Sequence, residues 1–149
     1  MNRSALFLLV EDNETDVESV QMLFKDSGHE MRVVSDGQQA IRYLSGKGVY
    51  SDRRQFPLPH LILLDLKMPR VNGFEFLKWL RLKSQGDLSL LPVVIMRAPD
   101  EPADLKLAND LGVSCYLTKP VSRSEFGKRM KTMNIFWRSQ AKIQSISAP

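Results

Sequence analysis

Charged side chains follow three apolar runs of this sequence, at the point where each run ends. Glu11 and Asp12 come directly after the first run. Asp65 comes after the third run, and Lys119 comes after the fifth. If these runs are parallel strands of one sheet, their carboxyl ends lie at one edge, and neighbouring strands are about 5 Å apart. We therefore expect the three carboxylates and the lysine to meet in one pocket.

Such a pocket would suit a cation and a phosphoryl group. Three carboxylates in one place repel one another unless a metal ion or a lysine compensates their charge. Oxygen ligands suit Mg²⁺, which keeps several water molecules and leaves room for a phosphate. An aspartate at the tip of a buried strand, beside Mg²⁺ and a lysine, can attack a phosphorus atom. The residues thus predict Mg²⁺ as the cofactor, Asp65 as the phosphoryl acceptor and Lys119 as the phosphoryl-binding group.

Each of these residues also has a purely structural interpretation. Acidic residues favour the first turn of a helix, so Glu11, Asp12 and Glu14 by themselves are more often capping residues than metal ligands. A lysine and a proline after a strand, as at Lys119, commonly form a turn. Asp65 alone fits a capped loop. Only the joint placement at three strand ends favours the chemical interpretation.

The elements that must position these residues alternate between short apolar and longer amphipathic segments. Strands are predicted over Ala5–Val10, Met31–Ser35, His60–Leu64, Pro92–Met96 and Val113–Leu117. Three of these runs are continuously apolar, which is typical of strands covered on both faces. Helices are predicted over Asn13–Ser27, Gln38–Leu44, Gly73–Lys83, Ala103–Leu111 and Ser122–Gln140, with one long connection over Ser45–Pro59. The strict alternation predicts an α/β fold with a doubly wound parallel sheet.

Length and composition restrict the class of protein. The 149 residues, 43% hydrophobic and 26% charged, fit one globular domain, which we place at 1–142, with a flexible tail at 143–149. No apolar run reaches the ~18 residues of a membrane span. The single cysteine, Cys115, excludes an internal disulfide and suits the cytoplasm.

From residue 121 onward the sequence contains six basic residues and only one acidic residue. We interpret this basic segment as a solvated surface rather than as a nucleic-acid site. We predict neither nucleic acid nor membrane as a partner.

Three segments resemble the receiver domain of two-component response regulators, typified by the bacterial chemotaxis response regulator. They are LVEDN at 9–13, LDLKMP at 64–69 followed by Asn-Gly at 72–73, and YLTKP at 116–120. The resemblance covers about residues 5–138 and, with all three segments present, is highly specific. It implies the flavodoxin-like receiver fold, with five parallel strands in the order 2-1-3-4-5 and five helices.

The resemblance also implies a role for each site residue. Asp65 would accept a phosphoryl group from a phosphohistidine of a sensor histidine kinase, and Lys119 would bind that group. Tyr116 matches an aromatic switch position, and the Lys119–Pro120 peptide bond is expected to be cis. The magnesium ligands that the resemblance implies are Glu11, Asp12, Asp65 and the backbone carbonyl of Lys67.

The long connection before the third strand and the absence of an output domain resemble the small stand-alone regulators associated with bacterial phytochromes. The expected protein is a phosphorelay component rather than an enzyme, with at most slow autodephosphorylation. Its expected partners are a sensor histidine kinase, with the phytochrome type as one candidate, and an unidentified target. A homodimer through the fourth helix, fifth strand and fifth helix is a further expectation. It rests on the apolar side chains of Phe126, Met130, Met133, Phe136 and Trp137.

The sequence departs from the family after the fourth strand, where the family carries a serine or threonine that hydrogen-bonds the phosphoryl group. Here Arg97 and Ala98 stand in its place, and they form a switch region with Tyr116. Arg97 either points to solvent and weakens switching, pairs with Asp65, helps to bind the phosphoryl group, or has no consequence. We favour a phosphorylatable receiver with altered switching.

Two other functions are considered. One is a pseudo-receiver, a protein-interaction module that works without phosphorylation because Arg97 replaces the hydroxyl residue. The other is a magnesium-dependent phosphohydrolase. The phosphohydrolase is disfavoured because such enzymes need a second acid near the nucleophile, and Lys67 stands two residues after Asp65.

Overall fold

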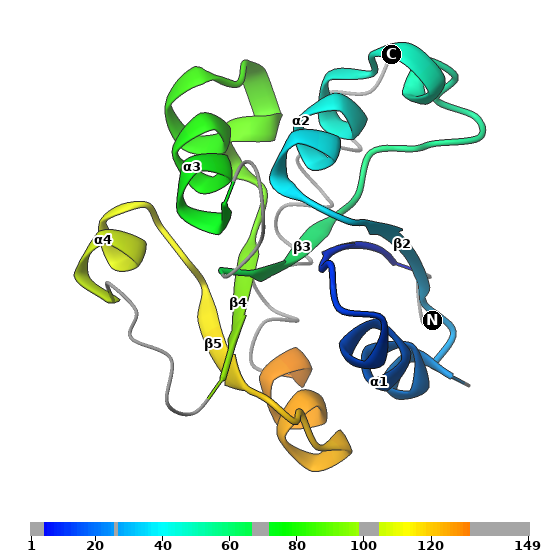
Figure 1. Cartoon of the computed structure of the whole chain (residues 1–149), viewed down its shortest axis with the longest axis vertical. Helices are drawn as coiled ribbons and strands as arrows, with labels where there is room; N and C mark the ends of the chain where they lie inside the picture. Colours follow the sequence, from blue (N-terminus) through cyan, green and yellow to red (C-terminus); the bar gives the residue numbers. More distant parts are fainter. Residues whose placement is uncertain (1–4, 26, 67–71, 99–104, 132–149) are drawn as a thin grey trace.

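The computed structural model describes residues 5–25, 27–66, 72–98 and 105–131 (Figure 1). A parallel five-stranded sheet forms its centre, with the order β2-β1-β3-β4-β5 that was expected. The strands are β1 (Leu6–Val10), β2 (Glu30–Val34), β3 (Leu61–Asp65), β4 (Val93–Arg97) and β5 (Cys115–Thr118). The chain reverses its direction of progress through the sheet between β1 and β3, which is where ligands bind in doubly wound folds.

Helices cover both faces of the sheet (Figure 1). The labelled helices are α1 (Glu14–Phe24), α2 (Gly37–Ser45), α3 (Gly73–Lys78) and α4 (Leu105–Asp110), and a further helical stretch covers 123–131. The helices α2, α3 and α4 lie on one face, and α1 and the 123–131 stretch lie on the other. Within the described ranges, no helix combines the length and apolar character that a membrane crossing requires.

The central strands are buried from end to end, as their continuous apolar runs predict. Every residue of β1 and β3 is buried. Successive side chains point to opposite faces of a strand. Leu64 and Ile95 accordingly belong to the core under α2 and α3, whereas Leu63 and Met96 belong to the core under α1. The sheet therefore separates two cores, and a residue's place in a strand decides which core it faces.

The predicted strand ends are wrong by one residue at two important positions. Asp65 and Arg97 were expected just after β3 and β4, but each is the last residue of its strand. Asp65 pairs in register with Met96, and the Lys119 amide donates to the Arg97 carbonyl at 2.8 Å. The hydrogen-bond ladder uses backbone groups, so it continues past the point where the apolar run stops. Both side chains therefore obey the alternation of the sheet.

Two other segments differ from prediction. The helix expected over Gly73–Lys83 ends as α3 at Lys78 and continues as a wider π-type turn, η2 (Trp79–Lys83). A 3-10 turn, η3 (Gly86–Leu90), follows it. The long connection contains a second 3-10 turn, η1 (Gly48–Tyr50). Parts of the predicted fourth and fifth helices, and the boundary at 142/143, lie outside the described residues, so that boundary stays a prediction.

Gly73 brings the first turn of α3 against the end of β3. Its amide donates to the Leu66 carbonyl at 3.1 Å. A Cβ atom at this position would lie 2.6 Å from the Leu66 Cα and 2.8 Å from the Asp65 carbonyl oxygen. Because both are backbone atoms, no side-chain rotation relieves the overlap. The absence of a side chain at Gly73 thus allows α3 to begin beside Asp65.

We expect Gly73→Ala to lower the free energy of unfolding by about 1–3 kcal/mol, the usual cost of overpacking. Urea denaturation measures this change. Gly127→Ala is the matched control, since a Cβ there meets nothing within 4 Å and Gly127 lies in the 123–131 helix. An alanine in a helix is worth roughly 0.5–1 kcal/mol over glycine, so the control is expected to be stabilised. If Gly73→Ala were as stable as the wild-type chain, the close approach of Gly73 to the backbone of Asp65 and Leu66 would be contradicted.

Candidate functional site

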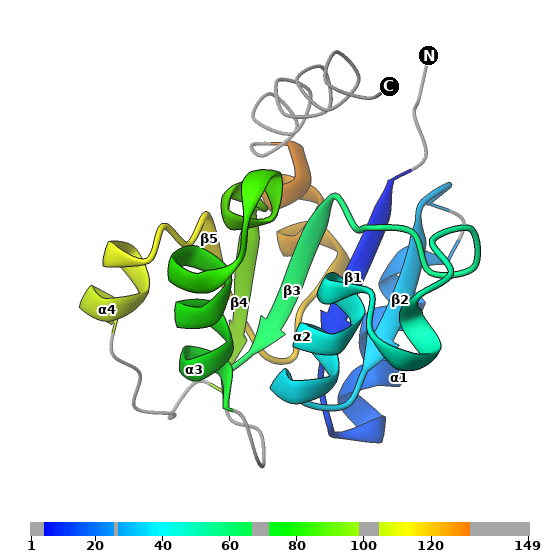
Figure 2. The same cartoon turned by 90° about the horizontal axis from the view of Figure 1, so that it is seen from above.

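An acidic niche lies at the carboxyl ends of β1 and β3, which point to the same edge of the sheet (Figure 2). Glu11, Asp12 and Asp65 each bring one carboxylate oxygen there, and these three oxygens lie within 4.8 Å of one another. Glu11 and Asp65 are only 1% and 3% exposed, whereas Asp12 is exposed. The three acids expected to converge from distant parts of the sequence are therefore close together.

Lys119 reaches into this niche from the segment after β5. Its Nζ lies 2.8 Å from Glu11 Oε1 and 3.4 Å from Asp65 Oδ1. A third carboxylate, Asp16, contributes Oδ2 at 2.9 Å. Asp16 was not predicted as a site residue. It lies in the first turn of α1, directly after the strand end that carries Glu11 and Asp12, and an acid in that turn is the signal that could have found it.

Glu11 is oriented by the backbone as well as by Lys119. Its Oε2 accepts hydrogen bonds from the amides of Asp12 at 3.2 Å and Asn13 at 3.5 Å, while Oε1 faces the lysine. The side chain thus folds back over the start of α1.

Among the described residues, the niche has more carboxylates than ammonium groups, and its carboxylates are unequally buried. Burial, and then the hydrogen bond and negative charge of Asp65, raise the pKa of Glu11 to about 8, against the opposing effect of Lys119. For Lys119, burial lowers the pKa, but the hydrogen bonds to Glu11 and Asp16 and the charge of Asp65 outweigh burial and raise it. Oxygen ligands with surplus negative charge fit a hard divalent cation. The Lys67 carbonyl, the fourth expected ligand, lies outside the described residues.

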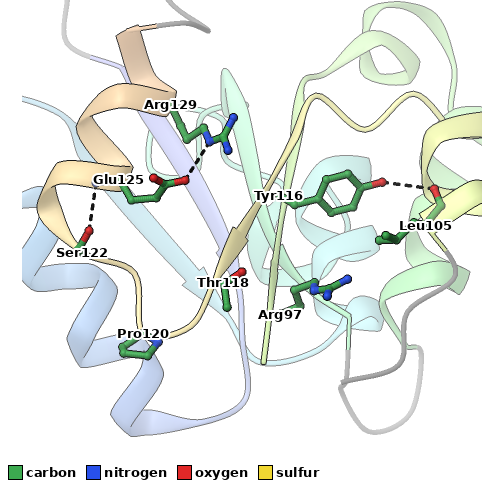
Figure 3. A pocket seen from close by; sticks show the side chains of 8 residues that line it. All are labelled: Arg97, Leu105, Tyr116, Thr118, Pro120, Ser122, Glu125 and Arg129. Atoms are coloured by element: carbon green, nitrogen blue, oxygen red, sulfur yellow. Dashed lines mark hydrogen bonds and ion pairs between the residues drawn. The ribbon is translucent and has the colours of Figure 1, made fainter. Parts of the chain in front are cut away.

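Arg97 faces away from Asp65. Asp65 pairs with Met96, so by strand alternation Arg97 points to the other face of the sheet. Both residues are described, and no hydrogen bond or ion pair joins them. In Figure 3, Arg97 lies instead beside Tyr116 at the wall of a hollow of about 500 Å³. The lining residues are Arg97, Leu105, Tyr116, Thr118, Pro120, Ser122, Glu125 and Arg129. The structure therefore contradicts the interpretation in which Arg97 pairs with Asp65.

Tyr116 is held against α4 rather than toward the niche. Its hydroxyl donates to the Asn109 side-chain oxygen at 2.9 Å and lies 3.4 Å from the Leu105 carbonyl. Burial raises the pKa of Tyr116, and the charge of Arg97 opposes this rise. Arg97 and Tyr116 are therefore electrostatic neighbours on the face opposite the acids. Ala98, which follows Arg97, has no side-chain donor for a group on Asp65.

Comparison with known proteins places the chain in a family. The model of the response regulator receiver domain matches residues 7–131. Response regulator Rcp1 of Synechocystis is 35% identical over 138 residues, which are 91% of this chain and 90% of Rcp1.

Two solved structures are also similar. The phosphorylated cyanobacterial phytochrome response regulator RcpA has a TM-score of 0.73 at 34% identity, covering 92% of this chain and 96% of RcpA. The Mn²⁺-bound form of Rcp1 has a TM-score of 0.70 at 34% identity, and the match covers 89% of this chain and 94% of the Rcp1 chain. With a matching family model over most of its length and the acid–lysine niche at the switch point of its sheet, the chain belongs to the response regulator receiver domain family.

Proposed function

We propose that this chain accepts a phosphoryl group on Asp65 from a sensor histidine kinase. The observation that carries the proposal is the position of Lys119, whose ammonium lies 3.4 Å from Asp65 in a niche with two more acids. Because similar proteins are named as phytochrome response regulators, a phytochrome-type kinase is the first candidate partner.

In the proposed reaction, an Asp65 carboxylate oxygen attacks the phosphorus of a phosphohistidine. The new P–O bond forms as the P–N bond breaks, and the electron pair of that bond returns to the imidazole nitrogen. The product is an acyl phosphate on Asp65. Lys119 neutralises phosphoryl oxygens as charge develops on them. In this proposal the chain is a phosphoryl acceptor rather than an enzyme. Its only further reaction is the slow hydrolysis of its own acyl phosphate.

Mg²⁺ is the proposed cofactor. Glu11, Asp12 and Asp65 would hold the ion, with the Lys67 carbonyl as the further ligand that the family resemblance implies. When bound, the ion supplies positive charge for the phosphoryl oxygens. Within the described parts of the chain, the surplus of carboxylates over ammonium groups in the niche supports this role. The Mn²⁺-bound form of Rcp1 supports it independently, because it is a similar protein that binds a divalent cation.

Acetyl phosphate with Mg²⁺ is expected to add one phosphoryl group to the chain, measured by intact mass. Asp65→Asn removes the nucleophilic oxygen and is expected to abolish the addition. Asp87→Asn is the matched control, since it removes one exposed carboxylate in η3, which leads into the amino end of β4 and so lies at the opposite edge of the sheet from the niche. An unmodified mass for the folded wild-type protein would contradict the proposal.

The second candidate is a phosphorylation-independent interaction module. The observation in its favour is that Arg97, not a hydroxyl residue, ends β4 and lies beside Tyr116. This candidate requires partner binding that is indifferent to Mg²⁺, to acetyl phosphate and to Asp65→Asn. A partner that binds only the phosphorylated chain would exclude it.

Cation binding is expected to depend on pH. Glu11 must lose its proton to act as a ligand, and its pKa is raised to about 8. Below that pH each bound Mg²⁺ ion displaces a proton from Glu11, so the affinity for Mg²⁺ falls by up to about tenfold for each unit by which the pH is lowered. Above that pH the affinity for Mg²⁺ no longer changes with pH. Calorimetric titration with Mg²⁺ across this range measures the effect.

Glu11→Gln is the control for this dependence. The variant has no titrating group at residue 11, so its weaker affinity is expected to vary much less with pH. If the wild-type dissociation constant is the same at about pH 6 and pH 9, Glu11 does not carry a displaceable proton.

A further inference from the structure

Asp16 shares Lys119 with the niche without belonging to the group of cation-binding oxygens. Its carboxylate lies 2.9 Å from the Lys119 ammonium. The three oxygens within 4.8 Å of one another come from Glu11, Asp12 and Asp65. The Asp16 side chain is 34% exposed, against 0% for Glu11 and 5% for Asp65. Asp16 therefore stands at the rim of the niche and acts on it through Lys119.

The local structure of α1 fixes Asp16 in this place. The Asn13 side chain caps the helix by accepting a hydrogen bond from the Asp16 amide at 3.0 Å. The carboxylate of Asp16 is thus in the first helical turn, where the helix dipole favours a negative charge. Its partner is fixed too, because the Lys119 amide is bonded to the Arg97 carbonyl at 2.8 Å. Two anchored backbones hold this ion pair.

The three contacts of the Lys119 ammonium are unequal. Glu11 and Asp16 accept hydrogen bonds at 2.8 and 2.9 Å. Asp65 lies at 3.4 Å and accepts no hydrogen bond from the ammonium in this arrangement. The lysine is therefore engaged mainly by Glu11 and Asp16, although Asp65 is the residue that would carry the phosphoryl group.

We propose that Asp16 is a positioning residue that draws Lys119 away from Asp65 until a phosphoryl group competes for it. This inference rests on the proposed function. A phosphoryl group carries about −1.5 to −2 charge, more than the single charge of a carboxylate. It also offers three strong acceptor oxygens. Asp16 thus opposes the contact between Lys119 and the phosphoryl group, and it sets how readily the modified state forms.

Asp16→Asn tests the proposal, because it removes the charge and keeps the shape of the side chain. Beryllofluoride is a phosphoryl mimic, and its binding at saturating Mg²⁺ can be followed by ¹⁹F NMR. We expect Asp16→Asn to be half-saturated at a beryllofluoride concentration about threefold lower than the wild-type chain requires. A change of this size corresponds to the loss of one partly exposed ion pair. Mg²⁺ alone is expected to bind more weakly, because the released ammonium competes with it at Glu11 and Asp65. If Asp16→Asn only damaged the local structure, the binding of both beryllofluoride and Mg²⁺ would become weaker.

Two variants serve as controls. Glu14→Gln removes an exposed carboxylate from the same first turn of α1 and is expected to leave beryllofluoride binding unchanged. Asp16→Glu restores the charge and is expected to return half-saturation toward the wild-type value. If Asp16→Asn matches Glu14→Gln, or binds beryllofluoride less well than wild type, the inference is wrong. If the wild-type chain accepts neither acetyl phosphate nor beryllofluoride, the proposed function itself fails.

Discussion

Two carboxylates buried where β1 and β3 end are the constraint on which the site depends. Glu11 and Asp65 are almost fully buried, and removing such charges from water is costly unless a partner compensates them. Lys119 supplies that compensation from another part of the chain, 54 residues after Asp65 in sequence. The strand order places β3 between β1 and β4, and β5 beyond β4. The lysine therefore crosses the end of the sheet to reach the acids.

The sheet also divides the candidate site residues into two groups. Asp65 and its neighbours in register face the core beneath α1, whereas Arg97 and Tyr116 face α4. The backbone hydrogen bond from Lys119 to the Arg97 carbonyl joins the two groups at 2.8 Å. The backbone of Lys119 is thus attached directly to the end of β4. This link requires no particular side chain at residue 97.

Much of this arrangement follows from the sequence, because buried strands and amphipathic helices have different periodicities. The apolar runs predicted the order of elements, and the charged residues after them predicted where Glu11, Asp12, Asp65 and Lys119 would converge. The ends of β3 and β4 were missed, since hydropathy is a property of side chains and the ladder is made by the backbone. Long-range contacts of single side chains were also missed. Arg53, for example, donates from the long connection to the Tyr43 and Leu44 carbonyls, each at 2.8 Å.

The charge balance of the niche has a consequence for the proposed function, because a cation and a phosphoryl group would share the niche. Among the described residues, the carboxylates of Glu11, Asp16 and Asp65 lie within 3.4 Å of the Lys119 ammonium, and Asp12 lies beside Glu11 and Asp65. A proton on Glu11 would relieve only part of this excess of negative charge. A phosphoryl group would add further negative charge beside Asp65. Coulomb repulsion at these short distances is weakly screened around Glu11 and Asp65, the two buried carboxylates. On the proposed function, we therefore expect a cation to enter the niche before, or together with, the phosphoryl group. Glu11 and Asp16 already engage the Lys119 ammonium, so the cation adds positive charge that Lys119 does not supply by itself.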